Sequence, residues 1–227
     1  AKEIKILGIN ITEEQLKQLE NYYNLLTIEN KKYNLTSITE KEDVYLKHFY
    51  DSLTIVKLEN INNKYILDVG TGAGFPGIVL KIIFPNIKID LLDSTLKKCN
   101  FLNKVIKELN LTNIRVLNYR AEEYAKTTRE KYDIIVSRAV APLKHLLEYS
   151  IPLLKVNGIF ISLKGNIENE LINIDNYYKK LSLKDEKMIS FNLPKNSGYR
   201  TIYSIKKNTK TNLKYPRSYS QIKKKDI

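Results

Sequence analysis

The sequence predicts an α/β fold built on a mostly parallel sheet, with a helical accessory at its N-terminal end. Three observations support this prediction. The first 60 residues carry apolar side chains at helical spacing, short apolar runs alternate with helical segments from Lys64 onward, and a glycine-rich turn follows the first of these runs. A chain of 227 residues is long enough for one such core with a small appendage.

The helical accessory is predicted over residues 1–60. Thr12-Glu13-Glu14-Gln15 has the form of a capping box, so a helix is expected from Glu13 to Glu29. A second box, Thr39-Glu40-Lys41-Glu42, predicts the start of another amphipathic helix that runs through Val56. The two helices would be joined by a short linker at Tyr33–Ser37, whose polar side chains can hydrogen-bond to their own backbone.

The core is predicted over residues 61–207. Five apolar runs are expected to form parallel strands: Tyr65–Val69, Ile87–Leu92, Ile114–Leu117, Ile134–Ser137 and Ile159–Leu163. Helices are expected between them near Gly77–Ile83, Leu96–Glu108 and Leu143–Leu154. Two more strands, Leu181–Phe191 and Tyr199–Ile205, would complete a seven-stranded sheet with a terminal hairpin and helices on both faces. Residues 208–227 form a basic tail that is expected to lie loosely on the surface.

Composition narrows the class of protein. The formal net charge of +13 favours a polyanionic partner, although a bias toward Lys, Asn and Ile can also come from the base composition of a genome. One cysteine, Cys99, and two histidines cannot build a disulfide framework or a zinc cluster, so no metal is expected. No apolar run approaches the roughly 20 residues that span a bilayer, and the first residues lack a signal-peptide pattern. A cytoplasmic protein without a membrane partner is therefore expected.

The first predicted strand leads directly into a glycine-rich loop, Gly70-Thr71-Gly72-Ala73-Gly74-Phe75-Pro76-Gly77. Glycines permit a tight turn and let the backbone approach a ligand closely. The loop satisfies G-x-G-x-x-G, and Asp93 closes the second strand about 20 residues further on, where an acid would bind a ribose. This pattern fits nicotinamide, flavin and S-adenosylmethionine (AdoMet) enzymes, and similar turns also form for steric reasons alone.

Two features favour AdoMet over the other cofactors. Asp68 precedes the first glycine by two residues, where its carboxylate can face the amino group of a methionine moiety and would repel a pyrophosphate. The segment Arg120–Glu123 follows the third strand, where polar groups can reach an adenine ring, although a solvated turn is the alternative. Phe75 and Pro76 provide either an apolar wall for the cofactor or a structural staple. A nicotinamide dehydrogenase is disfavoured by the first two features.

Several short motifs occur in a fixed order along the chain: Asn34-Leu35-Thr36, His48-x-x-Asp51-Ser52, Asp68-Val69-Gly70-Thr71-Gly72-x-Gly74-x-Pro76-Gly77, Leu92-Asp93-Ser94, Arg120-Ala121-Glu122-Glu123, Ser137-Arg138-Ala139, Leu163-Lys164-Gly165 and Tyr215-Pro216-Arg217. In this order the chain resembles the bacterial RsmG (GidB) family of 16S ribosomal RNA guanine-N7 methyltransferases over nearly its whole length. One departure lies in the tail, where Ser218-Tyr219-Ser220 stands in place of the basic residue, Ala and Gly of many relatives. The departure puts only the docking of the tail on RNA in doubt.

The resemblance implies a Rossmann-like class I AdoMet methyltransferase whose methyl acceptor is N7 of one guanine in the 530 loop. Together with the glycine-loop argument, it gives the expected cofactor-binding residues: Asp68, Gly70, Gly72, Phe75, Asp93, Ser94, Thr95, Ala121, Glu122 and Arg138. The expected partner is 16S ribosomal RNA or a small-subunit particle, and a monomer is expected. The alternatives are an AdoMet methyltransferase for another RNA nucleotide or a small molecule, and a non-catalytic RNA-binding protein of ribosome assembly.

Guanine N7 carries a lone pair and no proton, so its methylation requires no general base. Four residues are candidates for positioning the target: Lys164, Arg200, His48 and Asp51. Each has a structural alternative, as a solvated surface charge for the first two and as an anchor of the accessory helix for the last two. A hydrolase based on His48, Asp51 and Ser52 is rejected because the chain has no G-x-S-x-G elbow.

Overall fold

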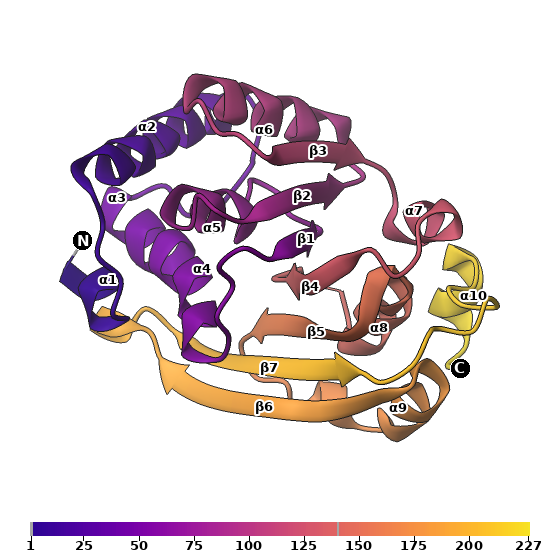
Figure 1. Ribbon diagram of the computed structural model, residues 1–227. Coiled ribbons are helices and arrows are strands. Elements are labelled where there is room, and N and C mark those ends of the chain that lie inside the picture. Colours follow the sequence, from indigo (N-terminus) through magenta and orange to yellow (C-terminus); the bar gives the residue numbers. More distant parts are fainter. Residues whose placement is uncertain (1, 140) are drawn as a thin grey trace.

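The computed structural model describes residues 2–139 and 141–227 and contains one seven-stranded sheet with helices on both faces (Figure 1). The strands are β1 (Tyr65–Val69), β2 (Lys88–Asp93), β3 (Ile114–Asn118), β4 (Tyr132–Ser137), β5 (Leu154–Lys164), β6 (Leu183–Asn192) and β7 (Tyr199–Lys207). Their order in the sheet is β3-β2-β1-β4-β5-β7-β6. The first five strands are parallel, and β7 lies antiparallel between β5 and β6. The predicted sheet and its terminal hairpin are confirmed.

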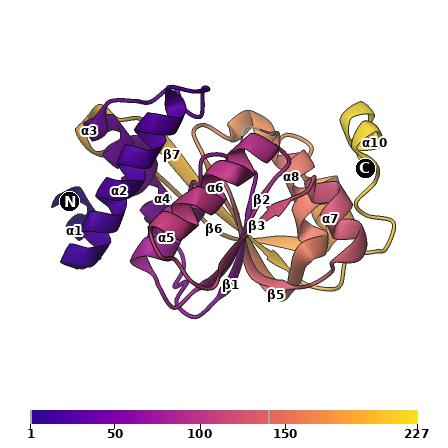
Figure 2. The ribbon, with the colours of Figure 1, turned by 90° about the horizontal axis from the view of Figure 1, so that it is seen from above.

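The α-helices and the π-helix η1 are α1 (Lys2–Ile6), α2 (Glu13–Asn30), α3 (Lys41–Val44), η1 (Tyr45–Tyr50), α4 (Asp51–Leu53), α5 (Gly77–Ile83), α6 (Leu96–Glu108), α7 (Ala121–Thr127), α8 (Leu143–Ser150), α9 (Asp175–Leu181) and α10 (Tyr219–Lys224). Short 3-10 turns are η2 (Thr54–Lys57), η3 (Ile151–Leu153), η4 (Glu168–Leu171) and η5 (Pro194–Asn196). Viewed along the sheet, α2, α5 and α6 lie on one side and α7 and α8 on the other (Figure 2). None of the helices in the described part of the chain has the length and hydropathy that crossing a bilayer would require.

Two apolar cores, one on each face of the sheet, hold these layers together. Successive side chains of a strand point to opposite faces. Accordingly, Ile66 of β1 packs into the core that includes Leu19 and Phe49 of the accessory, whereas Leu67 packs into the core that includes Leu147 of α8. All five side chains are fully buried. The accessory helices therefore share one core with the sheet.

A buried carboxylate ties the parallel strands to one another. Asp90 of β2 accepts two hydrogen bonds from the Arg115 guanidinium, at 2.9 and 3.0 Å, and one from each hydroxyl of Tyr65 (2.7 Å) and Tyr132 (2.6 Å). Burial and the bond to Asp90 raise the pKa of Tyr65 to about 12. These partners come from β3, β1 and β4, so one side chain links four strands.

The first capping box is confirmed and the second is wrong. Thr12 Oγ1 accepts from the Gln15 backbone, and the Gln15 side chain accepts from the Thr12 backbone. The next helix instead begins after Glu40, which makes no side-chain cap, and its path is divided among α3, η1, α4 and η2. The π-helical turn shifts the side-chain register. It accompanies a run of eight consecutive buried residues, 48–55, which a straight amphipathic stripe would not bury.

Three further boundaries differ from the predictions. β5 begins at Leu154 rather than Ile159, because the chain leaves α8 through the short turn η3. β6 begins at Leu183, because Leu181 ends the unpredicted helix α9 and Ser182 adopts a left-handed conformation. The tail is not loose, since Ser218 caps α10 and both Tyr215 and Ile222 are buried.

We predict that Asp90→Asn lowers the free energy of unfolding by about 2–4 kcal/mol, measured by urea denaturation. The amide NH₂ would face hydroxyl and guanidinium donors and leave at least one of them unpaired inside the protein. The matched control is Glu123→Gln, in an exposed pair with Lys126, which should change stability by less than about 0.5 kcal/mol. Equal losses in the two variants would contradict a structural role for Asp90.

Candidate active site

The glycine-rich loop leaves the end of β1 and turns into α5. Gly70, Gly72 and Gly74 have positive φ angles of 68°, 60° and 105°, which side chains disfavour. A Cβ added at Gly70 would lie 3.0 Å from that of Ala139, so the loop runs close to the end of β4. The backbone N–H groups of Gly70 and Thr71 donate to Leu92 O, which fixes the loop against β2.

Asp68 lies beneath this loop. Its carboxylate is fully buried, and Oδ2 accepts from Thr71 Oγ1 at 2.7 Å and from the Gly77 backbone at 2.8 Å. Its Oδ1 is also buried and has no hydrogen-bond partner within the described residues. Burial raises the pKa of Asp68 to about 7. The structure thus places Asp68 as a brace of the loop, and its carboxylate does not line the cleft that the loop borders.

A cleft of about 260 Å³ opens at the carboxyl ends of the central strands. Ligands of open parallel sheets bind at this edge. The cleft is lined by residues from the ends of β1 to β4 and the segments after them, from the start of α7, from α8 and from the tail: Val69, Gly70, Leu92, Asp93, Ser94, Tyr119, Arg120, Ala121, Glu122, Ala139, Ala141, Leu146, Tyr149 and Tyr219.

Two acids border the cleft at the ends of successive strands. Asp93 accepts from the backbones of Gly72 and Thr95, both at 2.9 Å, so it holds the glycine loop and the start of α6. Glu122 accepts from Arg120 Nε at 2.5 Å at the start of α7. Ionised carboxylates have further lone pairs, which suit ribose hydroxyls and an adenine amino group. These two carboxylates and the exposed backbone at Gly70 together fit the adenosine half of AdoMet.

A second hollow, of about 410 Å³, adjoins this cleft. Its charged and titratable lining residues are Lys47, His48, Arg138, Lys164, Glu170 and Arg200. Ala139 lines both the hollow and the cleft, so the two spaces meet at the end of β4. We call the second space the basic hollow. The fold therefore brings together side chains from η1, β5 and β7 that are far apart in the sequence.

One buried acid organises the basic hollow. Asp51 is fully buried, with Oδ2 at 3.0 Å from Arg138 Nη1 and Oδ1 at 2.7 Å from Arg200 Nε. Two guanidiniums against one carboxylate leave a net positive charge. Lys164 Nζ lies 2.8 Å from Ala141 O and 3.1 Å from Glu170 Oε1. Asp51 thus positions the arginines and does not itself line the hollow.

His48 is held in its neutral form. Arg138 Nη2 lies 2.8 Å from Nδ1, and because a guanidinium can only donate, Nδ1 accepts. Nε2 then carries the proton and donates to Thr36 Oγ1 at 2.9 Å. Burial and the Arg138 charge lower the pKa of His48 to about 3. The ring stacks on Phe75, with centroids 4.3 Å apart. Both nitrogens are engaged, so His48 offers no free base.

The structure separates the expected cofactor residues into two groups. Five of them line the cleft: Gly70, Asp93, Ser94, Ala121 and Glu122. Five do not line it: Asp68, Gly72, Phe75, Thr95 and Arg138. Phe75 is buried between His48 and Tyr22, which is the arrangement of a staple. Sequence analysis missed the tyrosines of the lining, and Tyr149 and Tyr219 carry no motif or spacing that would have revealed them.

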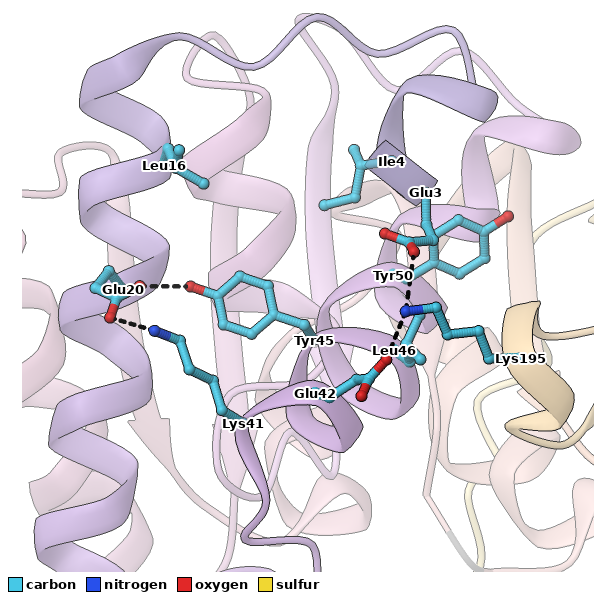
Figure 3. Close-up of a pocket in the computed structure, with 10 residues that line it drawn as sticks. All are labelled: Glu3, Ile4, Leu16, Glu20, Lys41, Glu42, Tyr45, Leu46, Tyr50 and Lys195. Carbon is cyan, nitrogen blue, oxygen red and sulfur yellow. Dashed lines mark hydrogen bonds and ion pairs between the residues drawn. The ribbon is translucent and has the colours of Figure 1, made fainter. Parts of the chain in front are cut away.

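Another hollow, of about 480 Å³, lies between the accessory and Lys195 of η5 (Figure 3). Its rim consists of ion pairs from Lys41 to Glu20 (2.6 Å) and from Lys195 to Glu42 (2.5 Å) and Glu3 (3.6 Å), around an apolar floor. Among the residues that the structure describes, it shares no lining residue with the cleft or the basic hollow. The charges on its rim are paired with one another, so we place the active site at the other two spaces.

The sheet order, the glycine loop at β1 and the acid at the end of β2 define a Rossmann-like class I AdoMet-dependent methyltransferase. Comparison with solved structures agrees on the fold. A precorrin-6y C5,15-methyltransferase from Geobacter metallireducens superposes with a TM-score of 0.56 at 15% identity, covering 81% of this chain and 98% of that one. TYW2 from M. jannaschii, solved in complex with AdoMet, superposes with a TM-score of 0.57 at 14% identity, covering 76% and 78%.

Sequence comparison identifies the family. The family model GidB, rRNA small subunit methyltransferase G, matches residues 15–201. Proteins named ribosomal RNA small subunit methyltransferase G are 48% identical over 219 residues in Mesoplasma florum, covering 96% of this chain and 92% of the relative, and 46% identical over 212 residues in Acetivibrio thermocellus, covering 92% and 88%. The chain belongs to the rRNA small subunit methyltransferase G family, which confirms the resemblance found in its motifs.

We predict that Asp68 makes stability fall as pH rises from about 4 to about 7. The folded chain, with a pKa of about 7, keeps a proton that the unfolded chain releases near its ordinary value of 3.8. Over this window the native state binds more protons, so the free energy of unfolding decreases with pH. Relative to Asp68→Asn, the wild type should lose roughly 2–4 kcal/mol between pH 4 and 7.5. Denaturation of both proteins across this range measures the difference, and a pH-independent difference would refute the prediction.

Proposed function

We propose that this protein transfers the methyl group of AdoMet to N7 of a single guanine in the 530 loop of 16S ribosomal RNA. The observation that carries the proposal is the meeting of the two spaces at Ala139, because a cofactor cleft there adjoins a hollow with excess positive charge. The relatives named ribosomal RNA small subunit methyltransferase G support an RNA substrate. The motifs outside the cleft that match the family support guanine as the methyl acceptor.

AdoMet supplies an electrophilic methyl group when bound. In our proposal the residues that line the cleft hold it directly: Gly70, Asp93, Ser94, Ala121 and Glu122. Behind them, Asp68, Gly72 and Thr95 fix the glycine loop and the start of α6. Arg138 and Phe75 position His48 and the accessory against the loop.

The chain needs to orient the target and does not need to remove a proton from it. Guanine N7 attacks through its lone pair, and both candidate bases are occupied, since His48 is neutral and fully hydrogen-bonded and Asp51 is buried between arginines. Alignment of two reactants contributes roughly 7–11 kcal/mol in favourable cases. A donor on N7 would compete with the methyl group, so Lys164 and Arg200 should bind guanine O6 or a phosphate.

The same proposal covers the partners and location of the protein. A ribosomal RNA substrate, as naked RNA or as a small-subunit particle, places the protein in the cytoplasm. One chain forms both the cleft and the basic hollow, which is consistent with a monomer.

We predict that the purified protein labels one 530-loop guanine at N7 when it is incubated with methyl-labelled AdoMet and small-subunit particles that lack the modification. Nuclease digestion and mass spectrometry locate the label. Label on a different nucleotide would support the alternative acceptor, and AdoMet binding without any label would support a non-catalytic assembly factor.

We predict that Lys164→Ala lowers kcat/KM for the RNA by about 10- to 100-fold, because each contact to a base or phosphate contributes about 1–3 kcal/mol. Arg200→Ala should lower it by at least as much, because it also removes one partner of the buried Asp51 carboxylate. The affinity for AdoMet should change less than about twofold, since neither side chain lines the cleft. Lys155→Ala is the matched control, an exposed lysine near the opposite end of β5. If Lys155→Ala lost as much activity, the losses would reflect the general positive charge of the protein. If AdoMet binding weakened in Lys164→Ala or Arg200→Ala, these side chains would act on the cofactor and not on the RNA.

A further inference from the structure

The C-terminal segment is fastened to the sheet domain before it reaches the cofactor cleft. Tyr215 is buried, and its carbonyl oxygen accepts from Arg129 Nη1 at 2.6 Å. Arg129 Nη2 donates a second hydrogen bond, to Thr211 O at 3.3 Å. These contacts fix the path of the chain after β7.

The second fastening is a buried ion pair. Glu148 of α8 is fully buried and accepts from the Arg217 backbone at 2.8 Å, from Arg217 Nη2 at 2.8 Å and from Nε at 3.1 Å. A bidentate pair between an arginine and a glutamate fixes the orientation of the arginine side chain as well as its distance from the carboxylate. The residue after Glu148 is Tyr149, which lines the cleft. The pair therefore holds the tail next to the cleft.

Two residues beyond this pair, Tyr219 enters the cleft wall. Ser218 caps α10 through a capping box, and Ile222 is buried on the inner side of the helix. α10 lies beside α7 and α8 (Figures 1 and 2). The Tyr219 ring lies 3.9 Å from Arg120 Cζ, and both side chains line the cleft. Lys223 Nζ lies 5.0 Å from the centroid of the same ring, and Tyr219 as a residue is 37% exposed where it lines the cleft.

We propose that Tyr219 is a cofactor-positioning residue, which with Arg120 forms an aromatic and cationic wall over the adenosine half of bound AdoMet. The inference rests on the proposed use of the cleft for AdoMet. The wall adjoins Ala121 and Glu122, where adenine is expected, and not the basic hollow, which Tyr219 does not line. An aromatic face binds a purine through stacking, and the fixed tail holds the ring in place before the ligand arrives.

The test measures ligand affinity by isothermal titration calorimetry on the full chain. Tyr219→Ala should weaken AdoMet about tenfold, which corresponds to 1.4 kcal/mol. S-adenosylhomocysteine and methylthioadenosine should weaken by the same factor, because the ring acts on the part that all three ligands share. Tyr219→Phe, which keeps the ring, should bind like the wild type. The control Leu213→Ala removes a side chain that is 88% exposed in the same tail and should leave every affinity unchanged.

The outcomes separate this inference from the proposed function. Equal affinities in the wild type and Tyr219→Ala would overturn the inference, while wild-type binding and methyl transfer would still support the function. Tighter binding to Tyr219→Ala would overturn it too, since the ring would then obstruct the cleft. A wild type that binds none of the three ligands would overturn both. Melting temperatures should match among the four proteins, because both substituted side chains are partly or largely exposed.

Discussion

The active-site region depends on the ion pairs of Asp51 with Arg138 and Arg200. The carboxylate comes from the accessory, and the two guanidiniums come from the segment after β4 and from β7. Removing one partner from a buried ion pair typically costs 3–5 kcal/mol, because the remaining charge is left without compensation. The cluster therefore locks the accessory onto the edge where the cleft opens. Its surplus positive charge remains at the place where an anionic nucleic acid would approach.

The same cluster sets the state of its neighbours. Because Arg138 bonds both Asp51 and His48, one guanidinium fixes the carboxylate, the imidazole tautomer and, through the stacked ring, Phe75 of the glycine loop. Below the loop, Asp68 and Asp93 hold its backbone from two sides. The loop conformation, which the positive φ angles of its glycines permit, is thus secured by acids on the sheet side and by aromatic packing on the accessory side.

The sequence predicted the sheet well because each strand is a short apolar run and each run lies between turn or helix signals. That Gly70 and Asp93 lie at one cleft was predictable, because a local motif fixes their spacing. The π-helical turn at Tyr45–Tyr50 was not predictable from the sequence, because it depends on burial of both sides of the segment. The tail was not predictable either, since Arg217 and Glu148 are 69 residues apart. The departure at Ser218-Tyr219-Ser220 gave no sign that Tyr219 lines the cleft, because that position depends on how the tail folds back onto the sheet domain.

The contrast between arginine and lysine explains how a chain with so much diffuse charge can still form specific sites. The net charge of +13 comes mostly from lysines, whereas only six residues are arginine. Every arginine makes a defined contact with a carboxylate or a carbonyl: Arg115, Arg120, Arg129, Arg138, Arg200 and Arg217. A planar guanidinium offers several donors in fixed directions, which a lysine ammonium does not. The arginines therefore fix the geometry of the sheet, the cleft and the basic hollow, and the lysines supply the general attraction for a polyanion.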